Sequence, residues 1–308
     1  MAQKNHLQSI LSSIYKGMIR TLLFPLFVLL IFSYSNSTKA QIIIVPNDVS
    51  GWNQTWIANF NGAQSSFNNW SEGGVNTISG TASTVFTKYY RDGRFTYGFR
   101  THLRYGQSKV NGNDLRKTDD LISIRNRVTY ELSEGSIYSA YGAIQFRTQF
   151  ADGFEYDKAK AGGDSLISRW FAPAYLIEGF GIEIKPNEDF SAEIGVGLKQ
   201  TIVTDDRLNT QYRIDEGENI RFEGGLTFGA QYKRTLMENT DFVTSIETFT
   251  NLLIPLNQTD IYWANSINGR INKYLSAVFQ FELRYDDDYS NRVQLKQVFA
   301  AGITLNIY

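Results

Sequence analysis

Hydrophobic and polar residues alternate along most of this chain with a period of two, which is typical of β-strands that have one apolar face. Segment 275–285 shows this clearly, because its odd positions are apolar or aromatic and its even positions are mostly polar. The alternation predicts twelve strands, at 52–66, 75–89, 94–106, 118–132, 136–150, 166–184, 189–203, 219–235, 240–253, 259–271, 274–286 and 293–308. Each segment exceeds the roughly 9 to 11 residues that cross a bilayer as a tilted strand.

The connectors between these strands alternate between short and long. The short ones are 90–93, 133–135, 185–189, 236–239 and 272–273, and the long ones are 107–115, 151–164, 205–218, 255–258 and 286–291. Successive turns of antiparallel strands lie at opposite ends of a sheet, so one end is tight and the other is elaborated. Outer-membrane barrels have short periplasmic turns and longer extracellular loops. We therefore predict an all-β, up-and-down antiparallel transmembrane β-barrel, with both chain ends on the periplasmic side.

The first forty residues differ from the rest of the chain. Basic residues precede the apolar run 22–32, and Thr38-Lys39-Ala40 provides a small-x-small cleavage site. The run is shorter than the roughly 20 residues that a spanning helix needs. We expect 1–40 to be a Sec-type signal peptide, 41–51 a short periplasmic segment and 52–308 the barrel domain, located in the bacterial outer membrane.

Composition narrows the class of protein further. The net charge is −1 and there is no cysteine, which argues against nucleic-acid partners, disulfides and thiolate metal sites. The mean hydropathy of −0.28 agrees with strands of which only alternate residues meet lipid. We expect no cofactor and no bound metal.

Two positions interrupt the alternation. Glu178 falls on the lipid-facing side of its strand, where a carboxylate is costly, so we expect either a β-bulge nearby or a neutral side chain. Tyr308 is out of phase with Phe299, Ile303 and Ile307, which share the outward face of the last strand.

With the apolar face outward, charged side chains line the lumen. The predicted basic wall is Arg100, His102, Arg104, Arg125, Arg127 and Arg147, and the predicted acidic positions are Glu193, Glu223, Glu247 and Glu282. Opposed walls of this kind can line a narrow water-filled channel that favours small polar or anionic solutes. The alternative is that the side chains interlock as salt bridges and fill the barrel, since small barrels are often filled by their own side chains.

Catalysis is the weaker hypothesis. His102 is the one histidine after residue 40, and a hairpin closed over 107–117 places Leu121 or Ser123 across from it. A Ser123/His102 pair is geometrically feasible, but the neighbouring arginines weaken the imidazole as a base. We expect that the protein is not an enzyme.

Acidic residues gather on the predicted long loops. They are Asp205, Asp206, Asp215, Glu216, Glu218 and the run Asp286-Asp287-Asp288. They are interpreted as solvated loops, with bridging of lipopolysaccharide phosphates through divalent cations as the alternative.

Several stretches resemble a family of uncharacterised outer-membrane β-barrel proteins from Bacteroidetes-type bacteria, known only as a domain of unknown function. The stretches are 65–74, 116–120, 147–151, 171–176, 201–206, 271–276 and 285–288. The resemblance implies a barrel without an established activity. We thus expect a narrow passive channel or, alternatively, a non-conducting structural, assembly or partner-docking barrel; a hydrolase using His102 is the third hypothesis. The expected partners are outer-membrane lipid, lipopolysaccharide and the outer-membrane assembly machinery.

Overall fold

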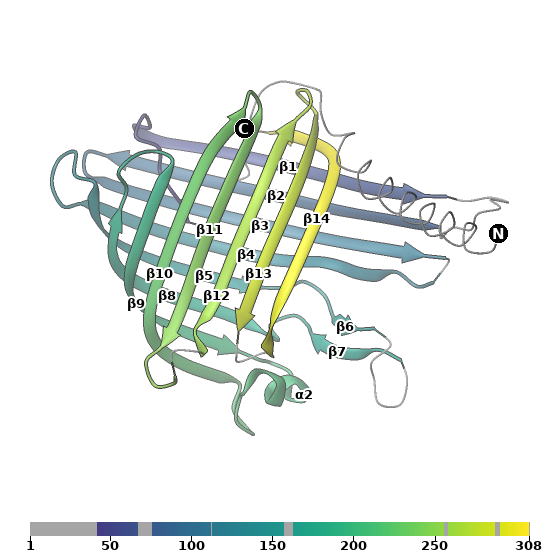
Figure 1. Ribbon diagram of the computed structural model, residues 1–308. Coiled ribbons are helices and arrows are strands. Elements are labelled where there is room, and N and C mark those ends of the chain that lie inside the picture. The colour runs from purple at the N-terminus through teal and green to yellow at the C-terminus, as the bar shows by residue number, and fades with distance from the viewer. Residues whose placement is uncertain are drawn as a thin grey trace, which may run out of the picture. The chain divides into compact units, whose positions relative to one another are not determined.

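The computed structural model describes residues 42–66, 76–111, 113–156, 163–255, 258–286 and 290–307. Within these ranges, twelve antiparallel strands close into a barrel in the ring order β1-β14-β13-β12-β11-β10-β9-β8-β5-β4-β3-β2 (Figure 1). The strands are β1 (Gly51–Ser65), β2 (Thr77–Asp92), β3 (Phe95–Val110), β4 (Arg116–Glu131), β5 (Tyr138–Thr148), β8 (Ala174–Ile184), β9 (Phe190–Ile202), β10 (Ile220–Met237), β11 (Thr240–Asn251), β12 (Asp260–Arg270), β13 (Leu275–Asp286) and β14 (Ser290–Asn306). The predicted twelve-stranded, up-and-down barrel is confirmed.

The two faces of the barrel wall differ in polarity. Large apolar side chains point outward and are exposed, as in Phe180 (67 %) and Phe299 (71 %). The buried side chains include many charged and hydroxyl groups, among them Arg127, Glu183 and Lys199. Side chains of a strand alternate between its two faces, so the period of two in the sequence becomes an apolar exterior and a polar interior.

One predicted strand is interrupted. Instead of one strand over 166–184, the chain forms β7 (Ser165–Ser168), a five-residue break and then β8. Pro173 lies in the break, where its missing backbone donor is not needed for strand pairing. β7 pairs with β6 (Gly153–Glu155) in a separate two-stranded sheet.

The most elaborate connections lie at one end of the barrel. The connection between β5 and β8 carries β6 and β7, and the connection between β9 and β10 carries α2 (Asp206–Asn209) and the 3-10 helix η1 (Thr210–Tyr212) (Figure 1). Ala172, Val203, Leu208, Tyr212 and Ile214 pack as a small apolar core between these two connections. The pattern analysis did not predict this hairpin, these helices or their core.

The expectation of a bulge beside Glu178 is wrong. β8 pairs with β5 and with β9 without a register shift from Tyr175 to Ile184. Glu178 therefore shares the outward face with Phe180, because both occupy even positions of one regular strand.

The barrel closes through a short seam between its first and last strands. β1 and β14 pair from Ile57 with Asn306 to Asn61 with Gly302, which is five residue pairs, whereas β1 and β2 pair over the whole of β1. Phe299, Ile303 and Ile307 are exposed together, as the phase of the last strand predicted. Tyr308 and the predicted signal peptide lie outside the described residues. Among the described residues, no helix is long and apolar enough to cross a membrane.

Candidate functional site

The candidate site is the interior of the barrel. Arg100 and Arg127 of the predicted basic wall are buried to 7 % and 6 % relative exposure. Side chains of Arg104, Arg125, Glu193, Glu247 and Glu282 are between 11 and 24 % exposed, and Glu223 is 6 % exposed. The basic residues point inward because side chains on β3, β4 and β5 alternate between the two faces, so that every second residue of a strand faces the lumen.

The basic and acidic groups meet in pairs that cross the lumen. Arg125 on β4 donates to Glu247 on β11 through both terminal nitrogens, at 2.9 and 3.1 Å. β11 is fifth and β4 tenth in the ring order, so this bidentate pair joins nearly opposite walls.

Arg127 forms a second group of ion pairs, which joins β4 to β8 and β9 on one side of the barrel. Its Nη1 lies 2.7 Å from Glu193 Oε2 and its Nη2 lies 3.2 Å from Glu183 Oε1, while its guanidinium stacks 4.4 Å from the ring centroid of Tyr141. One arginine thus contacts two carboxylates, and its removal would leave both of them in the interior without this partner.

A third group of ion pairs joins β3 and β4 to the last strands. Arg104 Nε lies 2.8 Å from Asp119 Oδ2, and its Nη2 lies 3.7 Å from Glu282. Lys296 Nζ lies 2.8 Å from the same Asp119 oxygen. We call Arg104, Asp119 and Lys296 the charged partition, because Arg104 lines two different cavities of the lumen, one of about 110 Å³ and one of about 280 Å³.

The later strands hold a further cluster around Lys199. Its Nζ lies 2.5 Å from Asp260 Oδ2 and 3.6 Å from Glu223 Oε2. Glu223 also accepts hydrogen bonds from Arg221 and from the Asn251 amide. The predicted acidic residue Glu223 is therefore already bound by the barrel's own side chains.

The other members of the basic wall lie in the same region. The guanidinium of Arg147 is 5.4 Å from the Tyr262 ring, and Arg100 faces Arg125 in strand register. His102 is directly opposite Ser123, one of its two predicted neighbours. Both line a cavity of about 110 Å³ together with arginines. The prediction that the protein is not an enzyme stays a prediction.

The segment before β1 enters the interior at the end with the short turns. Ile42 and Ile43 line a cavity of about 190 Å³ that Arg127, Glu193 and Glu247 also line. Ile43 packs with Val45 and Tyr89 in a buried cluster. The residues predicted as a short segment before the barrel thus fill part of its lumen.

Two cations hold this segment in place. Arg91 and Lys185 donate to the Val45 carbonyl at 3.4 and 3.2 Å, and to Asn47 Oδ1 at 3.1 and 3.2 Å. Arg91 also forms an ion pair with Glu131 at 3.1 Å. The segment is therefore held at two places on the barrel, by Arg91 at the end of β2 and by Lys185 just after β8.

The other region of the lumen is lined differently. A cavity of about 280 Å³ lies between β1, β2 and β3 on one side and the last strands on the other. Its lining is rich in hydroxyl and amide side chains, including Asn59, Asn61, Ser79, Thr81, Ser83, Thr87, Asn239, Asn268, Gln280 and Thr304. The charged partition formed by Arg104, Asp119 and Lys296 contributes to one side of it.

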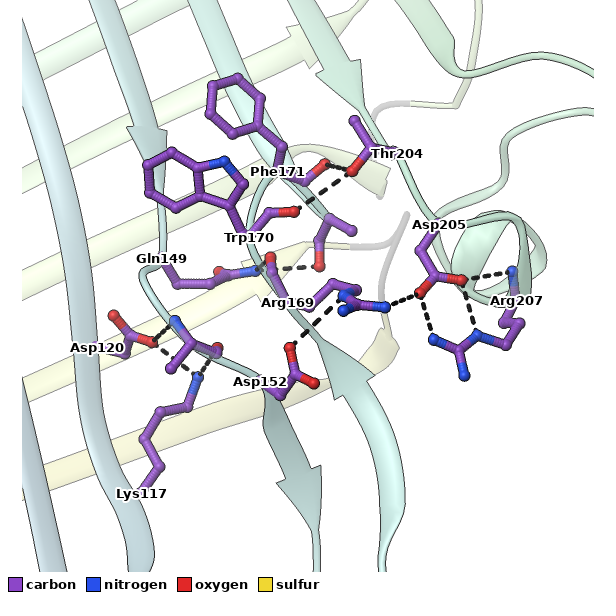
Figure 2. Close-up of polar contacts among 12 residues, drawn as sticks. Lys117, Asp120, Gln149, Asp152, Arg169, Trp170, Phe171, Thr204, Asp205 and Arg207 are labelled. Atoms are coloured by element: carbon purple, nitrogen blue, oxygen red, sulfur yellow. Dashed lines mark hydrogen bonds and ion pairs between the residues drawn. The ribbon is translucent and has the colours of Figure 1, made fainter.

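The long connections are tied together around the opposite mouth (Figure 2). Asp120 accepts from the backbone nitrogens of Phe150 and Ala151, and Gln149 donates to the carbonyls of Arg169 and Ala172. Arg169 reaches Asp205 at 2.8 Å, which joins the segment before β8 to the loop after β9. These contacts make the mouth a structured rim.

Asp205 is the centre of this rim. It receives hydrogen bonds from Arg207 and Arg169, and these bonds hold the pKa of the Asp205 carboxyl well below its usual range. Asp205 also accepts from the backbone nitrogen of Arg207 at the start of α2. Asp205, which was predicted to be part of a solvated acidic loop, is therefore an ion-paired residue that caps the start of α2.

The remaining acidic positions differ among themselves. Asp286 is 4 % exposed and lies 2.8 Å from Arg284, so the solvated-loop interpretation is wrong for this residue. Asp215, Glu216 and Glu218 are exposed. Asp287 and Asp288 lie outside the described residues. Within the described ranges, no cluster of three or more metal-ligating side chains is present.

Several residues of the interior network were not recognised in the sequence. The alternation of the strands could have identified Asp119 and Glu183 as inward residues. Both are at odd-numbered positions, as are the other inward residues of β4 and β8. The insertion of Ile42 and Ile43 had a weaker signal, an apolar run between the predicted cleavage site and the first strand.

A closed antiparallel barrel with an apolar exterior and a polar interior has the architecture of a transmembrane β-barrel. Residues 63–154 match a family described as a protein of unknown function (DUF3078). This match confirms the resemblance to a family of unknown function over those residues, which are less than half of the chain. No curated protein matches the sequence.

Solved structures with similar folds are bacterial barrels. The translocator domain of the autotransporter NalP from Neisseria meningitidis is 12 % identical, with 84 % of this chain and 89 % of that chain covered and a TM-score of 0.36. An outer membrane channel from Pseudomonas putida F1 is 11 % identical, with 85 % and 98 % covered and a TM-score of 0.40.

Proposed function

We propose that this protein is an outer-membrane barrel that passes small, polar, mainly uncharged solutes through a narrow conduit. The observation that carries the proposal is the hydroxyl- and amide-lined cavity of about 280 Å³. Its lining on β2 runs from Ser79 to Thr87. Eight steps of roughly 3.3 Å make this span about 26 Å along the strand, which at a tilt of roughly 40° covers about 20 Å of the roughly 25 Å height of an outer-membrane apolar band.

The exposed apolar wall supports the membrane location. Side chains such as Ile194 and Phe222, each 62 % exposed, would be unfavourable in water in such number. In a bilayer they meet hydrocarbon, and the closed strand pairing satisfies backbone groups.

The interior charges favour uncharged over anionic solutes. Arg104, Arg125 and Arg127 each have a carboxylate within 4 Å, so their charge is compensated inside the barrel. Beside charged residues such as Asp241 and Arg270, the conduit offers many neutral hydroxyl and amide groups that can replace part of a solute's hydration shell.

Recording from the purified protein in planar bilayers tests the proposal. We expect discrete conductance steps that shrink severalfold in Thr81→Trp, because Thr81 lines the conduit. The matched control is Ala82→Trp, since Ala82 is the next residue and faces outward by strand parity. A wild-type barrel that folds but never conducts would refute the channel.

A non-conducting structural or docking barrel is the second candidate. It is favoured by the interior ion pairs of Arg125 and Arg127 and by the inserted segment with Ile42 and Ile43, which all line the cavity of about 190 Å³. Silent bilayers combined with a stoichiometric partner that co-purifies in mild detergent would support this candidate.

A hydrolase is the least supported candidate, because it rests on the facing of His102 and Ser123 alone. It requires turnover of a lipid or a peptide that His102→Ala abolishes while heat-modifiable folding is retained. No turnover by the parent protein would end this hypothesis.

A further inference from the structure

The outer wall of the barrel contains a groove that the channel proposal does not use. The groove has a volume of about 890 Å³ and runs across the outer faces of β4, β5, β8, β9 and β10. Gly142 and Gly224 have no side chains to fill the groove, and Val128, Phe180 and Leu198 contribute to its apolar lining. On a barrel that otherwise presents large apolar side chains to lipid, this is a recessed surface.

A carboxylate lies in the middle of this groove. Glu178 pairs with Ile144 on β5 and with Leu198 on β9, and its own strand places Leu176 and Phe180 on the same face. Its four nearest outward neighbours are therefore apolar. Glu178 is near the centre of β8, so hydrocarbon alone would leave the carboxyl group poorly solvated.

A second polar side chain lines the same groove. Asn126 on β4 pairs with Ile144, which in turn pairs with Glu178, so Asn126 is two strand spacings, about 10 Å, from Glu178. The hydroxyl of Tyr97 donates to Asn126 Oδ1 at 2.8 Å, which orients the amide and turns its Nδ2 donors away from Tyr97. Gln200 is diagonal to Glu178 but does not line the groove.

We propose that the groove is the interface of a homodimer in the membrane. In a twofold arrangement, each contact between two different residues occurs twice. The same groove on two copies therefore brings Glu178 of each copy, an acceptor, towards Asn126 of the other, a donor. This pairing satisfies both polar groups away from water, and the glycine floor lets the two walls approach closely.

The proposal commits to a second copy because the groove carries both members of a complementary pair. A lipid acyl chain offers no donor for Glu178 at this depth. The inference rests on the proposed membrane location and is independent of whether the lumen conducts, so a silent barrel would leave it intact.

Dimerisation is measured by energy transfer between donor- and acceptor-labelled protein in lipid vesicles over a range of protein-to-lipid ratios. The chain has no cysteine, so Glu216→Cys on an exposed loop provides a single labelling site. We expect a dimer for the parent, and a dissociation constant raised about tenfold or more by Glu178→Leu or Asn126→Leu, because each removes two hydrogen bonds per dimer.

Two further variants separate an interface from a structural role. The exchange Glu178→Asn with Asn126→Glu keeps the complementary pair and should restore dimerisation. Gln297→Leu is the control, since Gln297 is exposed on the outer face of β14, outside the groove. A parent that stays monomeric at every ratio would overturn the proposal, and so would dimers that Glu178→Leu leaves unchanged.

Discussion

At the scale of single residues, glycines determine how the lumen is filled. A Cβ atom on Gly98 would overlap the side chain of Ile43, and one on Gly229 would lie 3.2 Å from Ile42 Cδ1. Without side chains, these two glycines leave gaps in the inner wall, here called sockets, into which Ile43 and Ile42 of the inserted segment pack. Their neighbours Arg100 and Gln231 are long polar side chains of the same inward faces, so the sockets are local gaps in a crowded interior.

Gly98→Val should release the inserted segment. The valine occupies the position of Ile43, and losing the burial of an isoleucine costs enough to raise amide exchange over residues 42–49 about tenfold or more. Hydrogen exchange with mass spectrometry measures the effect. Gly80→Val is the matched control, because a Cβ there meets only a carbonyl at 3.8 Å. Unchanged protection in Gly98→Val would contradict the socket.

Asp205 shows how one ionised side chain can join two connections. Because hydrogen bonds from Arg207 and Arg169 lower its pKa, its stabilising effect is complete above the usual carboxyl pKa and is lost only as the pH falls through the lowered value. The rim should therefore keep its protease resistance at pH 5, and Asp205→Asn should lose it at neutral pH. Asp215→Asn, a change at an exposed residue of the same loop, should have no effect. Equal resistance of the two variants would count against the role of Asp205.

At the scale of elements, the seam between β1 and β14 is the weakest part of the barrel wall. Five residue pairs join these strands, whereas β2 and β3 pair over the whole of both. Side chains reinforce the seam, since Thr304 Oγ1 donates to Asn59 Oδ1 at 2.8 Å. A barrel without free edges depends on this closure, because unpaired strand edges are unfavourable in lipid.

A disulfide across the seam tests its register. Asn59 and Thr304 face each other, so Asn59→Cys with Thr304→Cys should form a bond, and the chain has no other cysteine to compete. We expect the folded form to resist heating in detergent at higher temperature, and reducing agent to reverse the gain. Asn59→Cys with Ala300→Cys, four residues out of register, should not cross-link. Cross-linking of the second pair alone would mean that the seam has slipped.

At the scale of the whole molecule, the two ends of the barrel are unlike. One end has tight turns and receives the inserted segment, and the other carries β6, β7 and α2 with their apolar core (Figure 1). An outer-membrane barrel with this asymmetry exposes the elaborated end to the outside.

Cysteine labelling on intact cells tests the orientation. Glu216→Cys lies in the connection between β9 and β10, and Glu134→Cys lies in the short turn between β4 and β5; both positions are exposed. A membrane-impermeant maleimide should label the first on intact cells and the second only after permeabilisation. Reversed labelling would invert the orientation, and equal labelling would argue against an outer-membrane location.

The sequence by itself determined the barrel, its strand number and the inward residues, since the period of two assigns Arg125 and Glu247 to the same lumen without any tertiary information. Parity also placed Glu178 outward, where the regular pairing of β8 keeps it. The tertiary structure alone decided which groups meet. Arg125 and Glu247 are 122 residues apart and come together because the ring closes, and Ile43 meets Gly98 because a segment outside the strands enters the lumen. Local periodicity encodes which face a side chain occupies, but partners across a lumen depend on ring order, stagger and loop packing, which no local pattern encodes.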